Sequence, residues 1–84
     1  MKFVAVVSDW NYHVHTYVAN GYLPTSSSYD YAGTDEVSLD ANCGYIETPS
    51  DGWYYIGVNP YSNAPAPYTL QITLNANNQN CTIE

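Results

Sequence analysis

Oxygen-bearing side chains stand at several positions where a cation could bind. The candidate ligands, all at or beside expected loops, are Asp9, Asn11, Asp30, Asp35 and Glu36. A hard cation such as Ca²⁺ takes about six to eight oxygen ligands, which carboxylates and amides supply. The spacing matches no EF-hand loop, so a shared site requires the fold to bring the first two residues close to the other three. Ca²⁺ is therefore the candidate cofactor; the alternative is a solvated acidic face that keeps the domain soluble.

Aromatic side chains are the second group that could carry function. The chain has ten Tyr and two Trp, more than one thin core can bury, so several rings must lie at the surface. Flat rings with polar tips suit stacking on sugars and contact with proteins alike. The candidate ligand-binding residues, on expected loops, are Trp10, Tyr29 and Tyr61. The alternative is that such rings form core and cross-strand pairs.

The remaining residue patterns do not predict catalysis. His13 and His15 lie two apart on an expected strand and project from one face, as two ligands of zinc or copper could, but a structural site needs about four ligands. The alternative is a pair of solvent-facing rings. The sequence has no nucleophile elbow, zincin helix, P-loop or dinucleotide-binding pattern. Asp35 and Glu36 are adjacent, so on a strand they point to opposite faces and do not flank one glycosidic bond. We expect no catalytic residue and no enzyme activity.

The composition excludes two classes of partner. Of 84 residues 45% are hydrophobic, and one basic residue stands against eight acids, for a net charge of -7. Nucleic-acid binding relies on cationic side chains, so DNA and RNA are not expected partners. No apolar run approaches the roughly 18 residues of a membrane span, and membrane insertion is not expected either. The shortage of Lys beside abundant Tyr, Asn, Ser and Thr is typical of exported proteins, which predicts an extracellular location.

Two cysteines offer one covalent tie. A disulfide between Cys43 and Cys81 would close a loop of about 40 residues and contribute about 4 kcal/mol in the chain-entropy model. Two free buried thiols, or pairing with another chain, are the alternatives. We expect one domain over residues 1–84, with a polar C-terminal tail at 75–84 tied down by Cys81.

Short β-strands are the elements that must position these residues. Runs of β-branched and aromatic residues recur between turn signals, and no stretch has the 3.6-residue periodicity of a helix. Strands are expected over 3–7, 12–18, 36–40, 45–48, 53–59 and 68–74, with a long loop at 20–35 and a connection at 60–67. Alternation predicts these inward side chains: Tyr12, Val14, Thr16, Val18, Val37, Leu39, Tyr54, Ile56, Val58, Tyr68, Leu70, Ile72 and Leu74. The pattern indicates an all-β fold, either an antiparallel β-sandwich or a small barrel.

A succession of short motifs covers the chain from about residue 3 to 74. They are Asp9-Trp10-Asn11-Tyr12-His13-Val14, Pro24-Thr25-Ser26 with Tyr29-Asp30, Glu36, Pro49 with Gly52-Trp53-Tyr54-Tyr55-Ile56-Gly57-Val58, Tyr61-Ser62 and Tyr68-Thr69-Leu70. Their order resembles the bacterial pre-peptidase C-terminal domain. The resemblance implies a jelly-roll-like sandwich of about six to eight short strands, found beside secreted peptidases and other exported hydrolases. It also implies a non-catalytic role in secretion or in binding collagen or polysaccharide, with calcium used by related modules.

Two departures from that family pattern lead to two functional hypotheses. Asn11 stands where the family usually has a second Asp, which lowers the charge offered to a cation, and the family usually carries a further strand before the one at residues 3–7. One hypothesis is an accessory module that binds an extracellular polymer, protein or polysaccharide, or assists export of a hydrolase. The other is a self-assembling structural subunit, of a filament or surface layer, whose unpaired sheet edge accepts a strand from an identical subunit.

Overall fold

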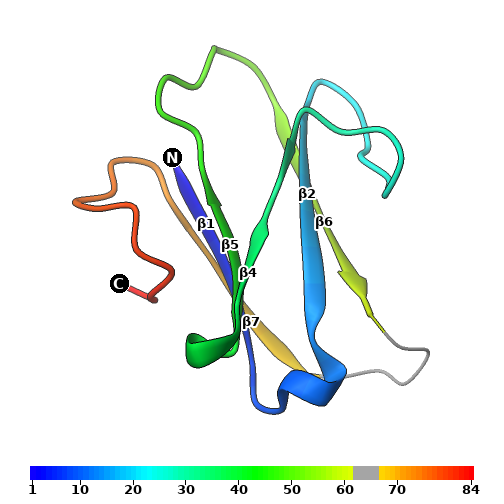
Figure 1. Cartoon of the computed structure of the whole chain (residues 1–84). Coiled ribbons are helices and arrows are strands. Elements are labelled where there is room, and N and C mark those ends of the chain that lie inside the picture. The colour runs from blue at the N-terminus through cyan, green and yellow to red at the C-terminus, as the bar shows by residue number, and fades with distance from the viewer. Residues whose placement is uncertain (62–66) are drawn as a thin grey trace.

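The computed structural model describes residues 1–61 and 67–84, which form two antiparallel β-sheets packed as a sandwich (Figure 1). One sheet, sheet A, has the strand order β4-β5-β1-β7, and the other, sheet B, has the order β3-β2-β6. The strands are β1 (Lys2–Val7), β2 (Val14–Asn20), β3 (Tyr31–Ala32), β4 (Thr34–Glu36), β5 (Ala41–Tyr45), β6 (Tyr54–Pro60) and β7 (Tyr68–Thr73); single 3₁₀ turns form η1 (Trp10–Tyr12) and η2 (Val37–Leu39). The expected all-β sandwich is confirmed. Most of the expected connection at 60–67 lies outside the described residues.

No helix within the described ranges has both the length and the apolar character needed to cross a membrane.

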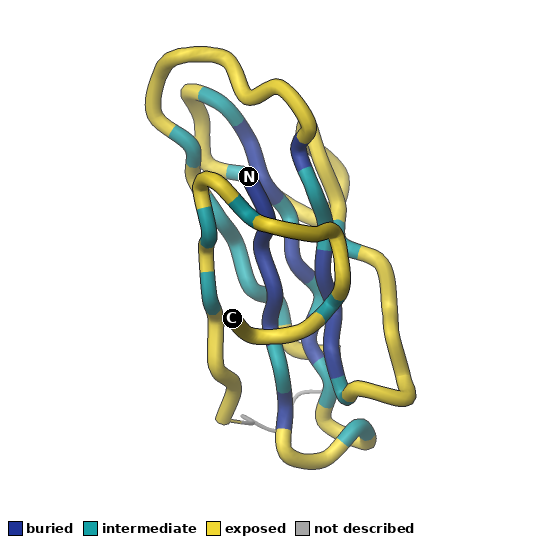
Figure 2. Tube along the Cα trace, turned by 90° about the vertical axis from the view of Figure 1, so that its left-hand side faces the viewer, coloured by how far each residue is buried: buried dark blue, intermediate teal, exposed yellow. Residues whose placement is uncertain are grey.

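Strand β1 is buried on both faces and joins the two layers of the core. Its inner side chains, Phe3, Ala5 and Val7, pack toward β2, where Val14 and Val18 are buried. Its outer face is covered as well, so the whole strand is dark blue in Figure 2 apart from one residue near its end. A strand that has no solvent-facing side is apolar at consecutive positions, as residues 3–7 are, and this run is what predicts the strand from the sequence.

A glycine opposite Phe3 makes room for the largest core side chain. Phe3 pairs with Gly44 across β1 and β5, and its ring lies over that residue so closely that a Cβ atom there would overlap ring carbons. The ring covers the stretch of β5 backbone that a glycine leaves bare. The core thus depends on a glycine for space, not for turn geometry.

One side of the sandwich is closed by the chain itself. The backbone leaves sheet B at the end of β3 and enters sheet A at β4, with Gly33 between them. The amide of Gly33 donates to the Thr16 carbonyl oxygen at 2.8 Å, and a Cβ at Gly33 would overlap the side chains of Thr16 and Asn42. A larger residue at this corner would push the two sheets apart.

Asn42 links the two sheets at that corner by side-chain hydrogen bonds. Its Oδ1 accepts from the backbone N–H of Thr16 at 2.9 Å and from the Thr16 hydroxyl at 2.6 Å. Its Nδ2 donates to Asp35 Oδ1 at 2.7 Å. Asn42 and Thr16 are each 1% exposed, so these groups have no water to replace a lost partner.

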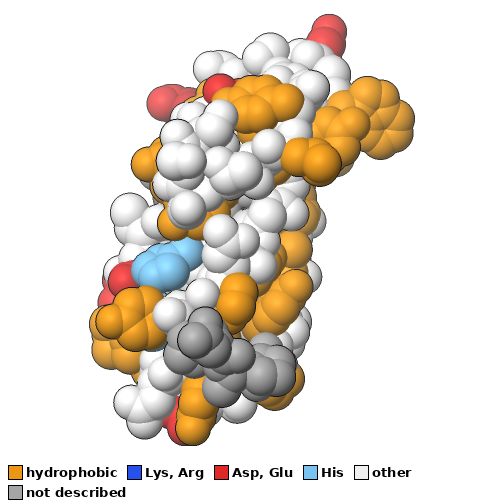
Figure 3. Space-filling view, turned by 90° about the vertical axis from the view of Figure 1, so that its right-hand side faces the viewer, with side chains coloured by type: hydrophobic (Ala, Val, Ile, Leu, Met, Phe, Trp, Pro, Cys, Tyr) orange, Lys and Arg blue, Asp and Glu red, His pale blue; other side chains and the backbone are white. Residues whose placement is uncertain are grey.

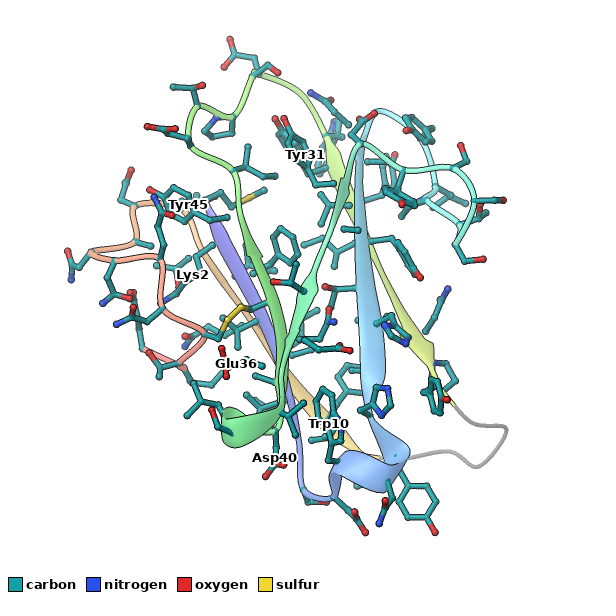
Figure 4. The ribbon with its side chains drawn as sticks, in the orientation of Figure 1. Lys2, Trp10, Tyr31, Glu36, Asp40 and Tyr45 are labelled. Carbon is teal, nitrogen blue, oxygen red and sulfur yellow. A yellow bond between two sulfur atoms is a disulfide. The ribbon has the colours of Figure 1, made fainter. Side chains whose placement is uncertain are left out.

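The C-terminal tail folds back across the outer face of sheet A, as Figure 2 shows. A disulfide joins Cys43 to Cys81, which confirms the expected pairing. The Lys2 ammonium, on the same side of the sheet in Figure 4, lies 3.0 Å from a Glu84 carboxylate oxygen and donates to Asn78 Oδ1 at 3.3 Å. Glu84 also exchanges two hydrogen bonds with the Gln71 side chain. The polar tail is therefore fixed at its end as well as at Cys81.

The expected strand at 36–40 is mostly the 3₁₀ turn η2, and the expected strand at 12–18 starts two residues later because Tyr12 lies in η1. Asp9 caps η1 by accepting from the Asn11 amide at 3.0 Å, which turns the chain and leaves Tyr12 exposed instead of inward. Val37 and Leu39, also expected inward, lie in η2 and are 57% and 43% exposed. Asp40 ends η2 with a positive φ of 52°, which an extended strand does not allow.

The last strand has the expected orientation but not the expected burial. Tyr68, Leu70 and Ile72 pair with Val7, Ala5 and Phe3, so they share the inner face with those core residues. All three are nevertheless exposed, by 47%, 36% and 38%, and Leu74 is 70% exposed. Sheet A has four strands and sheet B three, and sheet B leaves the inner face of β7 uncovered.

We expect Asn42→Ala to lower the free energy of unfolding by about 2 kcal/mol, because it leaves a buried Thr16 amide without an acceptor. Urea denaturation of the oxidised protein measures the change. Asn77→Ala, the same substitution at an exposed residue of the tail, is the control and should be within about 0.5 kcal/mol of the parent. Equal stability of the two variants would contradict a structural role for the Asn42 bridge.

Replacing both cysteines by alanine should cost up to about 4 kcal/mol, because the bond closes a loop with a sequence separation of 38 residues. The same variant should lose protection from hydrogen exchange at the Glu84 amide, which bonds Gln71 across the tail. Protection that survives loss of the disulfide would show that the Lys2 and Gln71 contacts alone hold the tail.

Candidate functional site

The outer face of sheet B carries a row of aromatic side chains along β6. Tyr55 lies in β6, and Trp53 and Tyr61 flank it where backbone hydrogen bonds continue the pairing. All three have the parity opposite to the inward Tyr54, Ile56 and Val58, and they are 80%, 40% and 66% exposed in chain order. From Trp53 to Tyr61 the row is about 26 Å long at strand spacing. Figure 3 shows apolar side chains along the length of this side of the molecule, with imidazole among them. We call these three residues the aromatic row.

Tyr61 is held at the end of the row by a stack of three rings. Its ring stacks on His13 with centroids 4.3 Å apart and planes 21° apart, and Trp10 stacks on His13 at 4.3 Å and 9°. Two stacked partners at that distance must lie on opposite faces of the imidazole. The His13 Nδ1 is also 2.8 Å from the Trp10 carbonyl oxygen, and the Tyr61 amide donates to the His13 carbonyl oxygen at 2.9 Å. Within the described ranges the other face of the Tyr61 ring has no stacked partner, and Tyr61 is 66% exposed on a fixed support.

Trp10 forms the base of that stack. It packs against the buried cluster of Ala5, Val7 and Val14 on one side and against His13 on the other. Figure 4 places it between the two sheets at the end of the sandwich. Of the two candidate ligand-binding residues at this end, Tyr61 is the one with an exposed face, and Trp10 positions it.

Tyr29 lies on a loop that folds over the same outer face. Its ring is tilted by 37° against Tyr17 of β2 at 5.1 Å, and Tyr29 is 44% exposed. Pro24, from the same loop, lies beside Gly57 of β6. The loop thus covers the middle of β6 at Gly57 and separates Tyr61 from Trp53 and Tyr55 within the aromatic row, with Tyr29 beside it.

Asp30 anchors this loop to the end of β2. Its carboxylate accepts from the Asn20 amide at 2.8 Å and from the Tyr22 hydroxyl at 2.9 Å. These two hydrogen bonds, the Asn20 bond first, lower the pKa of Asp30 below 3.8. The Tyr22 pKa is raised above 10.0 because its hydroxyl donates to that carboxylate. Asp30 is therefore already used as a loop anchor.

The expected calcium ligands occupy different parts of the fold. Asp9 and Asn11 belong to the η1 cap at one end of β2, whereas Asp30 lies at the other end, about 20 Å away along a seven-residue strand. Asp35 bonds Asn42 at the closed corner, and Glu36 accepts from the Ser38 hydroxyl at 2.8 Å. Across the described ranges no three His, Cys, Asp or Glu residues are placed to hold a metal ion. Calcium binding stays a prediction from the sequence.

The two histidines have structural neighbours. Their ring centroids are 5.3 Å apart in an edge-on arrangement, with His13 inside the ring stack. His15 lies near Asp35, with Nδ1 and Oδ1 4.0 Å apart. Both histidine rings therefore contact the aromatic rings around Tyr61, and within the described ranges they form no group of three metal ligands.

Trp53 and Tyr55 are the two members of the aromatic row that were not among the candidate ligand-binding residues from the sequence. Trp53 follows residues 49–52 and is not part of the buried core. Its carbonyl oxygen accepts a hydrogen bond from the Gly21 amide at 2.8 Å. The signal was present: residues 53, 55 and 61 share the parity opposite to the inward residues 54, 56 and 58. Applying the strand period through to Tyr61 would have found the row.

The aromatic row lies in a stretch without charge. Between residues 52 and 83 the sequence contains no Asp, Glu, Lys or Arg, although the chain carries eight acids elsewhere. A ligand on this face meets rings and amide or hydroxyl groups, and no charged side chain from β6 itself. The site favours an uncharged ligand.

Comparison with known proteins gives no match to any protein-family model. No curated protein matches the chain, and neither does any solved structure. The resemblance to the pre-peptidase C-terminal domain accordingly rests on the motifs quoted for it.

We expect the chemical shift of the Asn20 backbone amide to change as Asp30 is protonated, because that amide donates to the carboxylate. The pH midpoint of the change should lie below 3.8, the ordinary pKa of an Asp carboxyl. A lowered folded-state pKa means that ionised Asp30 stabilises the loop above the unfolded pKa. This stabilisation is lost as the pH falls through the folded pKa. NMR spectra of the amide across acidic pH measure the midpoint. Asp30→Asn should abolish the transition and Asp51→Asn should leave it; a midpoint at or above 3.8 would contradict the anchor.

Proposed function

We propose that this chain is a non-catalytic extracellular module that binds a neutral polysaccharide through its aromatic row. The observation that carries the proposal is the exposure of Tyr55 in β6 and of Trp53 and Tyr61 at its two ends, where backbone hydrogen bonds and the ring stack of Tyr61 fix them. Rings held in place lose little entropy on binding, and their faces suit the apolar faces of sugars.

Charge supports a neutral polymer over an acidic one. The uncharged stretch around the row offers no cation to pair with uronate or sulfate groups, and the net charge of -7 repels polyanions. Basic proteins would be attracted to the acidic side chains elsewhere in the chain, but residues 52–83 contribute none. A neutral chain can lie along the row without either effect.

The proposed setting agrees with several features of the chain. The Cys43–Cys81 disulfide is typical of oxidising compartments, and the scarcity of Lys and Arg suits proteins exposed to trypsin-like proteases. Membership of the pre-peptidase C-terminal family is part of the same proposal, because that resemblance implies a polymer-binding accessory module of a secreted hydrolase. The role of the domain would be to hold an attached enzyme at its substrate.

Trp53→Ala and Tyr61→Ala should each weaken polysaccharide binding by about tenfold, since a stacked ring contributes about 1.4 kcal/mol. Affinity electrophoresis in gels containing soluble neutral glucan or xylan, with polygalacturonate as the acidic comparison, measures the effect. Retardation by the neutral polymers and not by the acidic one is expected.

Tyr12→Ala is the matched control, because Tyr12 is 43% exposed in η1 and lies outside the row. It should bind like the parent. Binding that is unchanged in both row variants, or equally reduced in the control, would overturn the proposal, as would retardation by no neutral polymer in the set.

A further inference from the structure

Opposite the Gly33 corner no strand in the described ranges joins the two sheets, and we call this the open side of the sandwich. There the last strands of the two sheets are β6 and β7, and in the described part of the chain β6 pairs with β2 alone and β7 with β1 alone. Each strand therefore has one edge whose backbone groups do not bond another strand. Figure 1 shows β6 and β7 at the outer borders of their sheets.

An apolar strip lies along this open side. Tyr68, Leu70 and Ile72 have the orientation of core residues, because they pair with Val7, Ala5 and Phe3, yet each is more than a third exposed. Their side chains alternate with Thr69, Gln71 and Thr73, so the strand has one apolar and one polar face. An exposed strand of this kind is a site for adding another strand.

The usual protections of a sheet edge are missing from β7. The strand has no Lys, no Pro and no charge, and it lies with β6 inside the uncharged stretch of residues 52–83. Two copies of a chain with net charge -7 repel each other wherever their acids meet. Neither β6 nor β7 carries a carboxylate, and Glu84 bonds Gln71 on the outer, polar face of β7. The edge and inner face of β7 are therefore where two copies can approach without a carboxylate from either strand, which favours a second copy as the occupant.

We infer that β7 pairs with β7 of a second copy, antiparallel and about a twofold axis perpendicular to sheet A. Such a contact is isologous, because the same strand serves on both sides and the pattern of alternate apolar residues is self-complementary. It joins the two four-stranded sheets into one continuous sheet. The inner faces of both β7 strands then lie on the same side, where Leu70 and Ile72 of the two copies can cover one another.

This inference is independent of the aromatic row. The row consists of the odd residues of β6, on the outer face of sheet B, whereas the pairing uses the backbone edge of β7 and its inner face. Loss of the aromatic row should leave the pairing in place, and loss of the pairing should leave binding by the single chain in place, so the two can be tested separately on the same protein.

The first experiment is sedimentation equilibrium of the oxidised chain at micromolar to millimolar concentrations, together with hydrogen exchange of the β7 amides. The molar mass should double as the concentration rises, and those β7 amides that do not bond β1 should become protected over the same range. A chain that remains monomeric overturns the inference, and so does a dimer in which these amides stay unprotected.

Two variants give the matched comparison. Ile72→Lys places a charge on the exposed inner face of β7 and should abolish the dimer at the concentrations where the parent associates. Leu23→Lys, at a loop residue 76% exposed, should dimerise like the parent. At concentrations where the parent is monomeric, Ile72→Lys should also keep the parent's retardation by neutral polysaccharide, and it should keep the parent's far-UV circular dichroism. Equal dimerisation of both variants would overturn the inference.

Discussion

The Asn42 side chain is the contact on which the arrangement of the two sheets depends. A single buried amide satisfies the backbone and hydroxyl of Thr16 on sheet B and bonds Asp35 on sheet A, so the corner at Gly33 is fixed in spacing and direction. At this corner the chain runs directly from β3 of sheet B to β4 of sheet A. On the opposite side the edge strands β6 and β7 are not joined by such a corner.

A domain of this size buries little surface, and its core is extended by covering both faces of β1. Sheet B covers the inner face, and the C-terminal tail covers the outer one, with the disulfide at Cys43 and the Lys2–Glu84 pair as its two ties. Lys2 is 1% exposed, so its ammonium depends on that partner, because removing the carboxylate would leave a buried charge uncompensated. The tail is thus a third layer of the fold.

Much of the fold follows from the sequence because strand alternation is local information. The runs at β1, β6 and β7, the two faces of β6 and β7, and the Cys43–Cys81 pair were all predictable. The turns η1 and η2 were not, because a cap by Asp9 and a left-handed residue at Asp40 override the apolar alternation around Tyr12 and Val37. Nor was the exposure of Leu70, since burial depends on which strand lies opposite. The candidate site likewise was only partly predictable. An exposed Tyr61 was expected, but its stacking on His13 and Trp10 is a tertiary contact that the local sequence does not reveal.

Strand β6 borders both proposed surfaces, because its odd and even residues face opposite sides of sheet B. Its odd residues carry the aromatic row, and its even residues pack on the core beside the open side. A twofold axis perpendicular to sheet A keeps both copies of sheet B on the same side, so the two aromatic rows of a dimer face the same direction. A long polymer could then contact both rows, and the second contact would form at the high effective concentration of a tethered site. Weak stacking by three rings per chain would become firm attachment because the open side of the sandwich brings two chains together.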